Sequence, residues 1–232
     1  MDSLSQAFLN SLLLLFSGNS EIWEIIGISF RVSTLAILVA TPPALLTAFL
    51  LTYGRFPGRR LLISIFSTLL SIPAVVVGLT LYVVLSRQGP LGDWKLLFTQ
   101  TAMVLGQIAL CFPILVAMGH SALQASDRRV WETARTLGAS RPRALFTLFR
   151  EVRFGLFAAL LAAYGRIIAE VGASMMLGGN ILHYTRNIPT AIALETSKGE
   201  FAEGIALGLV LLVLVFSLNG LLHYLQGKGR WT

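Results

Sequence analysis

Five long, mostly apolar stretches constrain the fold of this chain more than any other feature. They cover roughly Ile22–Tyr53, Leu61–Ser86, Leu96–Gly119, Phe154–Leu177 and Ile205–Leu225. Crossing the hydrocarbon core of a bilayer takes about 20 such residues in a helix. Only 12% of the residues are charged, against about a quarter in soluble domains, so a water-soluble fold of this length would lack polar surface. We expect an all-α integral membrane protein with five transmembrane helices.

Basic residues mark alternate loops of the expected topology. They follow the first span, lie between the third and fourth spans, and follow the fifth, as Arg55, Arg59, Arg60, Arg128, Arg129, Arg135, Arg141, Arg143, Arg150, Arg153, Lys228 and Arg230. The other loops carry little excess charge, because acidic residues accompany their Lys and Arg. Short loops rich in Lys and Arg lie on the cytoplasmic side of a membrane. We therefore expect the N-terminus outside and the C-terminus in the cytoplasm.

The spans leave short segments at both ends of the chain. The opening apolar run, Leu4–Phe16, is too short to span comfortably and lacks the basic flank of a signal peptide, so we expect a helix lying in the membrane interface. The expected units are an interfacial segment, a transmembrane domain and a cytoplasmic tail, at residues 1–20, 21–226 and 227–232. Within the spans, Pro42-Pro43, Pro73 and Pro113 each remove a backbone donor, which should kink a helix unless neighbouring groups compensate.

The longest cytoplasmic segment, residues 120–153, is expected to contain two short helices. Asp127 is a suitable N-cap for the first helix, and Gly138 fits its end. Ser140 can cap the second helix, with Pro142 in its first turn. Two short helices joined at a glycine form a rigid projection, which suits docking of another protein better than a flexible tether does.

The letters WETARTLGAS, followed by LFTLFRE, resemble the cytoplasmic loop of binding-protein-dependent ABC importer permeases. Glu132, Ala134 and Gly138 match that family's pattern of Glu-Ala-Ala, three residues and Gly, whereas Arg150 and Glu151 replace its Leu-Pro ending. In the family this loop inserts a coupling helix into a cleft of the ATPase subunit. The resemblance implies a docking contact formed by Glu132, Thr133, Ala134, Arg135, Leu137, Gly138 and Ala139. An ordinary amphipathic cytoplasmic helix is the alternative interpretation.

Three further stretches resemble the members of this family that import tungstate, molybdate and sulfate. They read IPAVVVGLTLYVVLSRQGPLG, GRIIAEVGASMMLGGN and YTRNIPTAIALETSKGEF, and the last looks most like tungstate permeases. The resemblance implies a bacterial inner-membrane permease that works by alternating access, with molybdate or sulfate as alternative substrates. It also implies four partners: cytoplasmic ABC ATPase subunits, an extracytoplasmic substrate-binding protein, a second copy of the chain and membrane lipid. The binding protein would dock near Gly89–Trp94 and Gly179–Glu203.

Charged and small residues within the spans are candidates for the transport path or its gate. Arg166 and Glu170 lie four residues apart on one helical face, which allows an internal ion pair. Ionisable residues in spans are costly and usually face a partner or a water-filled route, so the pair either pins helix packing or takes part in gating. Arg31 either attracts an anion or snorkels to the outer interface. Ser174 belongs to a run of small residues that suits close packing or a gate.

The chain lacks the sequence features of an enzyme. It has no GxxxxGK[ST] loop, so we expect ATP and Mg²⁺ on the partner ATPase and no cofactor or metal on this chain. The spans contain no Ser-Lys or paired-Asp arrangement of an intramembrane hydrolase. A secondary transporter would need carboxylates near the midplane and usually an inverted repeat, for which Glu170 alone is thin support. An amino-acid or metal importer is a rival within the same family, and we expect no nucleic acid partner.

Overall fold

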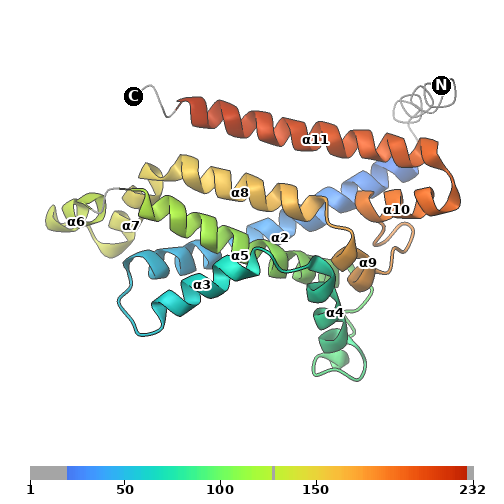
Figure 1. The fold of residues 1–232 in the computed structure, drawn as a ribbon, viewed down its shortest axis with the longest axis horizontal. Helices are drawn as coiled ribbons and strands as arrows, with labels where there is room; N and C mark the ends of the chain where they lie inside the picture. Colours follow the sequence, from blue (N-terminus) through green and yellow to red (C-terminus); the bar gives the residue numbers. More distant parts are fainter. Residues whose placement is uncertain (1–19, 127–128, 229–232) are drawn as a thin grey trace.

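The computed structural model describes residues 20–126 and 129–228, whose regular secondary structure is entirely helical (Figure 1). The helices are α2 (Ser20–Tyr53), α3 (Arg59–Leu69), α4 (Ala74–Leu85), the 3-10 turn η1 (Gly92–Trp94), α5 (Gln100–Gln124), α6 (Arg129–Thr136), α7 (Arg141–Glu151), α8 (Arg153–Ile168), α9 (Gly172–Gly178), α10 (Ile188–Lys198) and α11 (Phe201–Lys228). The expected all-α fold is confirmed for these residues. The predicted interfacial helix and most of the predicted tail lie outside the described residues.

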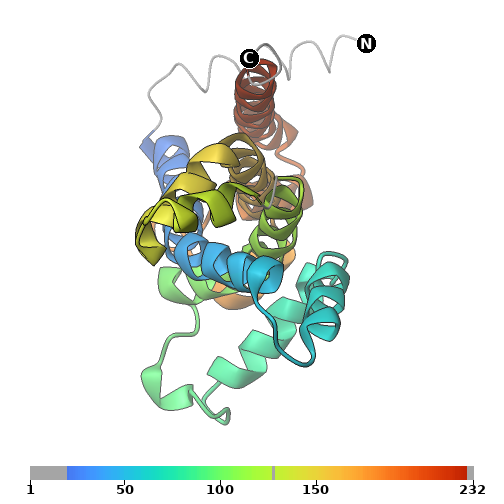
Figure 2. The same cartoon turned by 90° about the vertical axis from the view of Figure 1, so that its left-hand side faces the viewer.

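The long helices run side by side along the length of the molecule. α5 packs on both α2 and α8, and α8 also contacts α11. Figure 2 shows this bundle from one end. The short helices α6 and α7 lie at one end of the bundle and α10 lies at the other (Figure 1). The expected docking segment is therefore separated from the opposite loops by the full length of the spans.

A stripe of alanines lets α2 and α5 approach closely. Ala36, Ala40, Ala44 and Ala48 recur every four residues on α2, and each is at most 1% exposed. A Cβ atom added to Gly119 of α5 would lie 3.3 Å from the Cβ of Ala48, so a larger residue would have to displace its neighbour. Small residues at such spacing allow close helix packing in a membrane, where burial of apolar surface alone gives little driving force.

Two helices are long and apolar enough to cross a membrane, namely α2 with 34 residues and α5 with 25. Two more crossings result if α3 with α4 and α8 with α9 each count as one bent span. α11 adds the apolar stretch Phe201–Ser217. The apolar helices thus correspond to the five predicted spans, and the number that cross the membrane stays a prediction.

Two of the predicted spans are broken. The chain bends by 104° between α3 and α4, and by 60° between α8 and α9. Pro73 is the N-cap of α4 and has an extended backbone, with φ of −64° and ψ of 128°, so the predicted disruption at this proline is confirmed. By contrast, α2 continues through Pro42-Pro43 and α5 continues through Pro113. As a result, α4 leaves the long axis and projects to one side of the bundle (Figures 1 and 2).

Glycines on both partners bring α4 against α9. A Cβ atom on Gly78 of α4 would lie 2.9 Å from the Cα of Ala173 and 3.1 Å from the Sδ of Met176. A Cβ atom on Gly172 of α9 would lie 2.8 Å from the Cγ2 of Val75. α4 is therefore held against α9 at a close crossing. A residue larger than glycine at Gly78 or Gly172 would force its neighbours to move.

Replacing Gly78 with valine should overpack this crossing and lower the free energy of unfolding by about 1–3 kcal/mol. The chain has one cysteine, Cys111, and it is buried, so reaction of its thiol with a fluorogenic maleimide during heating in detergent reports unfolding. Gly27→Val is the matched control, because nothing lies within 4 Å of a Cβ atom at Gly27. Equal melting temperatures for the two variants would contradict the tight crossing.

Candidate functional site

The segment that resembles a coupling loop contains the two predicted helices, and α6 ends where Gly138 was expected to stop it. Gly138 has a φ of 84°. Its N–H donates to the carbonyl of Arg135 at 3.2 Å, and the N–H of Ala139 donates to the carbonyl of Ala134 at 3.0 Å. These two bonds around a left-handed glycine form a Schellman motif, which satisfies carbonyls that a helix end leaves free. The turn between α6 and α7 is therefore held by the backbone itself.

The second helix also begins as predicted. Ser140 occupies the N-cap position of α7 and Pro142 lies in its first turn, but the side chain of Ser140 makes no capping hydrogen bond. Ala144 and Leu148 are fully buried, and Leu148 belongs to an apolar cluster with residues of α2, α5 and α8. α7 thus seats the segment on the end of the bundle. The predicted N-cap of the first helix, Asp127, lies outside the described residues.

The predicted docking residues form an accessible surface. Exposed residues are Glu132, Thr133, Arg135, Leu137 and Gly138, and partly buried residues are Ala134 and Ala139. Leu137 is 82% exposed, and the Nη1 atom of Arg135 donates to the carbonyl of Ala139 at 2.6 Å. These exposed side chains are accessible to a partner protein, and their role in docking stays a prediction.

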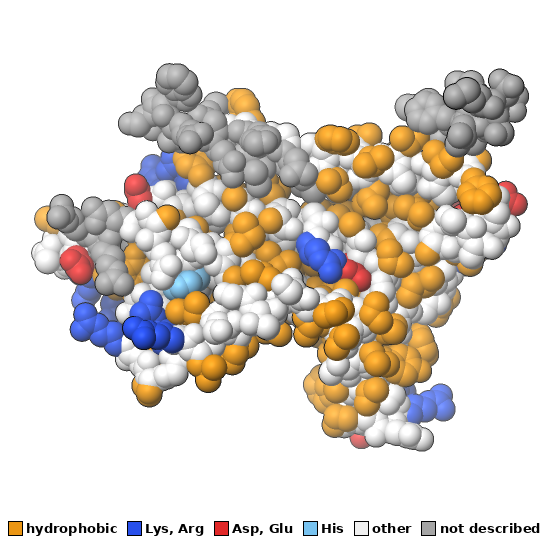
Figure 3. Space-filling view, in the orientation of Figure 1, with side chains coloured by type: hydrophobic (Ala, Val, Ile, Leu, Met, Phe, Trp, Pro, Cys, Tyr) orange, Lys and Arg blue, Asp and Glu red, His pale blue; other side chains and the backbone are white. Residues whose placement is uncertain are grey.

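Basic side chains gather around the same end. Figure 3 shows Lys and Arg over the end of the bundle near α6 and α7, while hydrophobic side chains cover the flanks. The exposed arginines of the α2–α3 connection, the start of α3, α7 and the start of α8 are Arg55, Arg60, Arg141, Arg143, Arg150 and Arg153. These exposed arginines, which are scattered in the sequence, therefore share one end of the structure.

The break between α8 and α9 is built around Glu170. Glu170 is 6% exposed and forms the predicted ion pair with Arg166. Its Oε1 atom also accepts hydrogen bonds from the backbone N–H groups of Gly172, at 3.0 Å, and Ala173, at 3.4 Å. On the other side of the break, the Nε2 atom of Gln107 on α5 donates to the carbonyl of Ile167 at 3.3 Å. The carboxylate thus caps α9 and holds Arg166, whose side chain is 45% exposed.

The other two path candidates lie in different settings. Ser174 is buried on α9, and its hydroxyl oxygen has no hydrogen-bond partner among the described residues. Arg31 is exposed on α2, and no hydrogen bond or ion pair joins it to Arg166 or Glu170 within residues 20–126 and 129–228. The structure therefore brings together Arg166 and Glu170, with Ser174 one turn further on.

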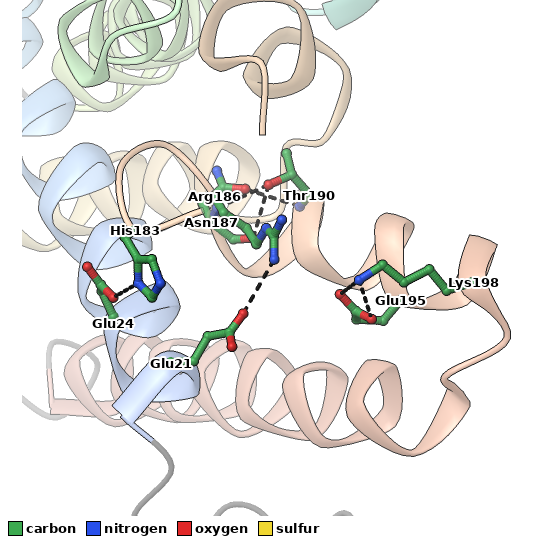
Figure 4. A network of polar contacts seen from close by, with 8 residues as sticks. All are labelled: Glu21, Glu24, His183, Arg186, Asn187, Thr190, Glu195 and Lys198. Atoms are coloured by element: carbon green, nitrogen blue, oxygen red, sulfur yellow. Dashed lines mark hydrogen bonds and ion pairs between the residues drawn. The ribbon is translucent and has the colours of Figure 1, made fainter. Parts of the chain in front are cut away.

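At the opposite end, an ion pair and a hydrogen bond tie the loop between α9 and α10 to the start of α2 (Figure 4). The Nη1 atom of Arg186 lies 3.4 Å from Oε1 of Glu21, and the Nδ1 atom of His183 lies 2.6 Å from Oε2 of Glu24. These pairs leave no local signal in the sequence, because their partners lie 165 and 159 residues apart.

A buried capping box fixes the same loop where α10 begins. The Oδ1 atom of Asn187 accepts from the N–H of Thr190 at 3.1 Å, and the Oγ1 atom of Thr190 accepts from the N–H of Asn187 at 3.0 Å. The N–H of Ile188 donates to the hydroxyl oxygen of Ser29 on α2 at 2.7 Å. The start of α10 is therefore bonded directly to α2.

Comparison with known proteins identifies the family. Residues 35–230 match the family described as the binding-protein-dependent transport system inner membrane component. The chain belongs to this family. The match runs from α2 into the C-terminal residues and includes the coupling segment and both bent helix pairs. Together with the long apolar helices, it makes the chain a multi-pass inner membrane protein.

Individual relatives cover most of the chain. The tungstate uptake system permease protein TupB of Campylobacter jejuni is 39% identical over 226 residues, which are 97% of this chain and 95% of the relative. A probable anion ABC transporter permease protein of Haloferax volcanii is 41% identical over 203 residues, 85% and 88% of the two chains. The crystal structure of an amino acid ABC transporter with histidines matches with a TM-score of 0.67, 15% identity and coverage of 93% and 97%. At that identity, the likeness supports the fold alone.

Replacing Glu170 with alanine should lower the free energy of unfolding by about 2 kcal/mol, since it removes the ion pair and leaves the first N–H groups of α9 without an acceptor. Glu170→Gln keeps an acceptor oxygen and should lose about half as much. Thermal unfolding in detergent measures both variants. A loss as large for glutamine as for alanine would mean that the charge, and not the cap, decides stability here.

Proposed function

We propose that this chain is the membrane-spanning permease subunit of an ABC importer for an oxyanion, with tungstate as the first candidate substrate. The observation that carries the proposal is the similarity, over 97% of the chain, to a permease named for tungstate uptake. The exposed surface of α6 around Glu132 and Leu137 supports docking on an ATPase subunit. The chain itself is not catalytic, because ATP and Mg²⁺ bind to that partner.

Molybdate and sulfate are the second candidates. The molybdenum transport system permease protein ModB of Escherichia coli K12 is 35% identical over 188 residues, 77% of this chain and 82% of the relative. The sulfate transport system permease protein CysT of the same organism is 28% identical over 222 residues. These tetrahedral dianions differ mainly in size, and selection among them would rest mainly with the binding protein. Membership in a binding-protein-dependent family gives no support to a secondary transporter.

The proposed assembly is a homodimer of this chain with two ATPase subunits and one extracytoplasmic binding protein. The end with α6 and α7 faces the cytoplasm, because basic residues mark that side. The chain then makes five crossings, with its N-terminus outside and its C-terminus inside. The binding protein docks on the outer surface near Gly89–Trp94 and Gly179–Glu203, and lipid surrounds the dimer.

The proposed mechanism is alternating access. ATP binding draws the two ATPase subunits together and displaces the α6 helix that is docked in each. This displacement rocks the spans, so that the path between the two copies opens toward the binding protein and receives the anion. Hydrolysis then returns the ATPase subunits and the spans to the inward-open arrangement.

Arg166 is the proposed anion contact on the path. Its side chain is 45% exposed although it lies within an apolar helix, and a charged group facing lipid there would be costly. The buried Glu170 holds the guanidinium group and shapes the bend that follows. Ser174 is a second candidate, since its buried hydroxyl oxygen has no partner among the described residues.

Arg166→Leu should lower tungstate uptake into liposomes about tenfold, the effect of losing roughly 1.4 kcal/mol of favourable interaction. Arg31→Leu is the matched control and should leave uptake unchanged, as expected of an arginine that snorkels to the interface. The double variant Arg166→Leu with Glu170→Gln separates loss of the positive charge from the effect of an unpaired carboxylate. A large loss in Arg31→Leu together with normal uptake in Arg166→Leu would reverse the assignment.

ATP hydrolysis by the reconstituted complex tests the function as a whole. The chain is co-purified with a candidate ATPase subunit and placed in liposomes that contain the binding protein, and tungstate, molybdate, sulfate and an amino acid are supplied in turn. We expect stimulation by tungstate or molybdate alone. Glu132→Arg should abolish it by reversing a docking charge, and Gly138→Val should abolish it because valine strains a backbone at φ of 84°.

Stimulation by the amino acid would overturn the oxyanion assignment. Failure to form a complex with any ATPase subunit would overturn the importer proposal.

A further inference from the structure

An aromatic cluster joins the proposed coupling helix to the end of α2. The ring of Trp131 on α6 lies 5.2 Å from that of Phe49 and 6.0 Å from that of Tyr53, measured between ring centroids. The Phe49 and Tyr53 rings are themselves stacked at 5.2 Å. Here these three residues are called the aromatic bracket. Rings at such separations are in direct contact, so α6 touches α2 through side chains at one defined point.

The chain itself connects α6 to other helices. α6 follows α5 along the sequence and is followed by α7, and Val152 is both the last cap of α7 and the first cap of α8. Between α2 and α6, however, lie α3, α4 and α5. A displacement of α6 therefore reaches α5 and α8 through covalent connections. It reaches α2 directly through the aromatic bracket, with Val130 beside it, and indirectly through α5 and α7, which also pack on α2.

The end of α2 is bonded to two further helices at the same level. Arg59 of α3 donates from Nε to the carbonyl of Leu51 and from Nη2 to the carbonyl of Thr52, the latter at 3.1 Å. The hydroxyl oxygen of Thr52 lies 2.8 Å from Nδ1 of His120 on α5, and both residues are buried. The end of α2 that carries Tyr53 is therefore connected by hydrogen bonds to both α3 and α5.

The opposite end of α2 meets the loop that precedes α10. With 34 residues, α2 is about 50 Å long at 1.5 Å per residue. It carries the aromatic bracket near one end and, at the other, the ion pair with Arg186 and the hydrogen bond from Ile188 to Ser29. A single continuous helix thus connects the proposed ATPase contact with the proposed contact for the binding protein.

Space beside Trp131 allows α6 to turn against α2. Two clefts of about 330 Å³ and 550 Å³ flank the ring, and Tyr53, Gly54 and Trp131 line both. The hydroxyl group of Tyr53 is buried and has no hydrogen-bond partner among the described residues. The ring of Trp131 is thus tilted against those of Phe49 and Tyr53, by 59° and 37°, and has free volume beside it. Such a contact suits a joint that moves better than an interlocked one.

From this arrangement, and resting on the proposed importer function, we infer that the aromatic bracket of Phe49, Tyr53 and Trp131 transmits movement of the coupling helix α6 to α2. Trp131 is thus a positioning residue for transport. It does not contact the substrate, and its ring is directed toward α2, whereas the docking residues Glu132 and Leu137 are exposed for the ATPase. α2 then carries the displacement along its length to the loop before α10.

Coupling efficiency of the full complex tests this inference. In liposomes with the ATPase and binding protein, Trp131→Ala should still assemble and hydrolyse ATP, but the substrate imported per ATP should fall about tenfold, since one strong ring contact is lost. Trp131→Phe should restore most of it, because a ring remains. Phe157→Ala is the matched control, as Phe157 is an aromatic residue of α8 that is 47% exposed, and it should leave the ratio unchanged.

Distance measurements distinguish transmission from simple stabilisation. In a Cys111→Ser background, a spin label is placed either at Leu46 of α2 or at Ala162 of α8, both exposed, and the distance between the labels of the two copies is measured with and without ATP. In the unaltered complex both distances should change. In Trp131→Ala the change at Ala162 should persist while the change at Leu46 becomes much smaller.

Three outcomes would overturn the inference. Trp131→Ala with unchanged movement at Leu46 would show that α2 receives the displacement by another route. Loss of movement at both labels, or loss of assembly in Trp131→Ala and Tyr53→Leu alike, would reduce the bracket to a packing role. Failure of the unaltered chain to assemble with an ATPase would instead remove the proposed function on which the inference rests.

Discussion

The close contact of α2 with α5 supports the rest of the fold. In a membrane, lipid solvates apolar side chains as well as a neighbouring helix does, so helices associate through close packing. The alanine stripe from Ala36 to Ala48 provides that closeness, and α8 then packs on α5 and α11 on α8. Each end of α2 contacts a segment with a proposed function. The contact between α2 and α5 holds both of these ends in place relative to the rest of the bundle.

The second constraint is the need to satisfy backbone groups where a helix breaks inside an apolar layer. A free N–H or carbonyl group there costs several kcal/mol. At the bend between α8 and α9, Gln107 donates to the carbonyl of Ile167 and Glu170 accepts from two N–H groups of α9. Polar residues within spans therefore have two uses in this chain. Gln107 satisfies a backbone carbonyl at the bend. The guanidinium group of Arg166 satisfies no backbone group there and is partly exposed, which leaves it free for the proposed contact with the anion.

Local sequence signals predicted the elements well. The apolar stretches gave the helices, Gly138 and Ser140 marked the turn between α6 and α7, and the spacing of Arg166 and Glu170 predicted their ion pair. Each of these depends on residues within about one or two helical turns of one another. The roles proposed for the coupling and path residues stay predictions, since they concern partners and substrate.

Contacts between distant segments were beyond the reach of local patterns. Hydropathy is continuous across both helix breaks, so the apolar pattern shows neither bend, and only Pro73 marked the position of the 104° bend. The aromatic bracket joins Phe49 to Trp131, and His183 pairs with Glu24 across 159 residues. In both pairs, nothing in the sequence around either residue distinguishes it from an ordinary loop or helix residue. Only the packing of α2 against its neighbours brings the partners together.

The direction of α4 affects how a bilayer can enclose this chain. The loop beyond α4 carries Arg87, Asp93 and Lys95, all exposed, and it lies at the side of the bundle rather than at either tip (Figure 1). Charged groups against hydrocarbon are costly, so this loop belongs in water or against another protein, in agreement with the proposed contact of Gly89–Trp94 with the binding protein. The extended backbone at Pro73 turns α4 out of the bundle. It thereby carries a charged loop away from the apolar sides of the long helices.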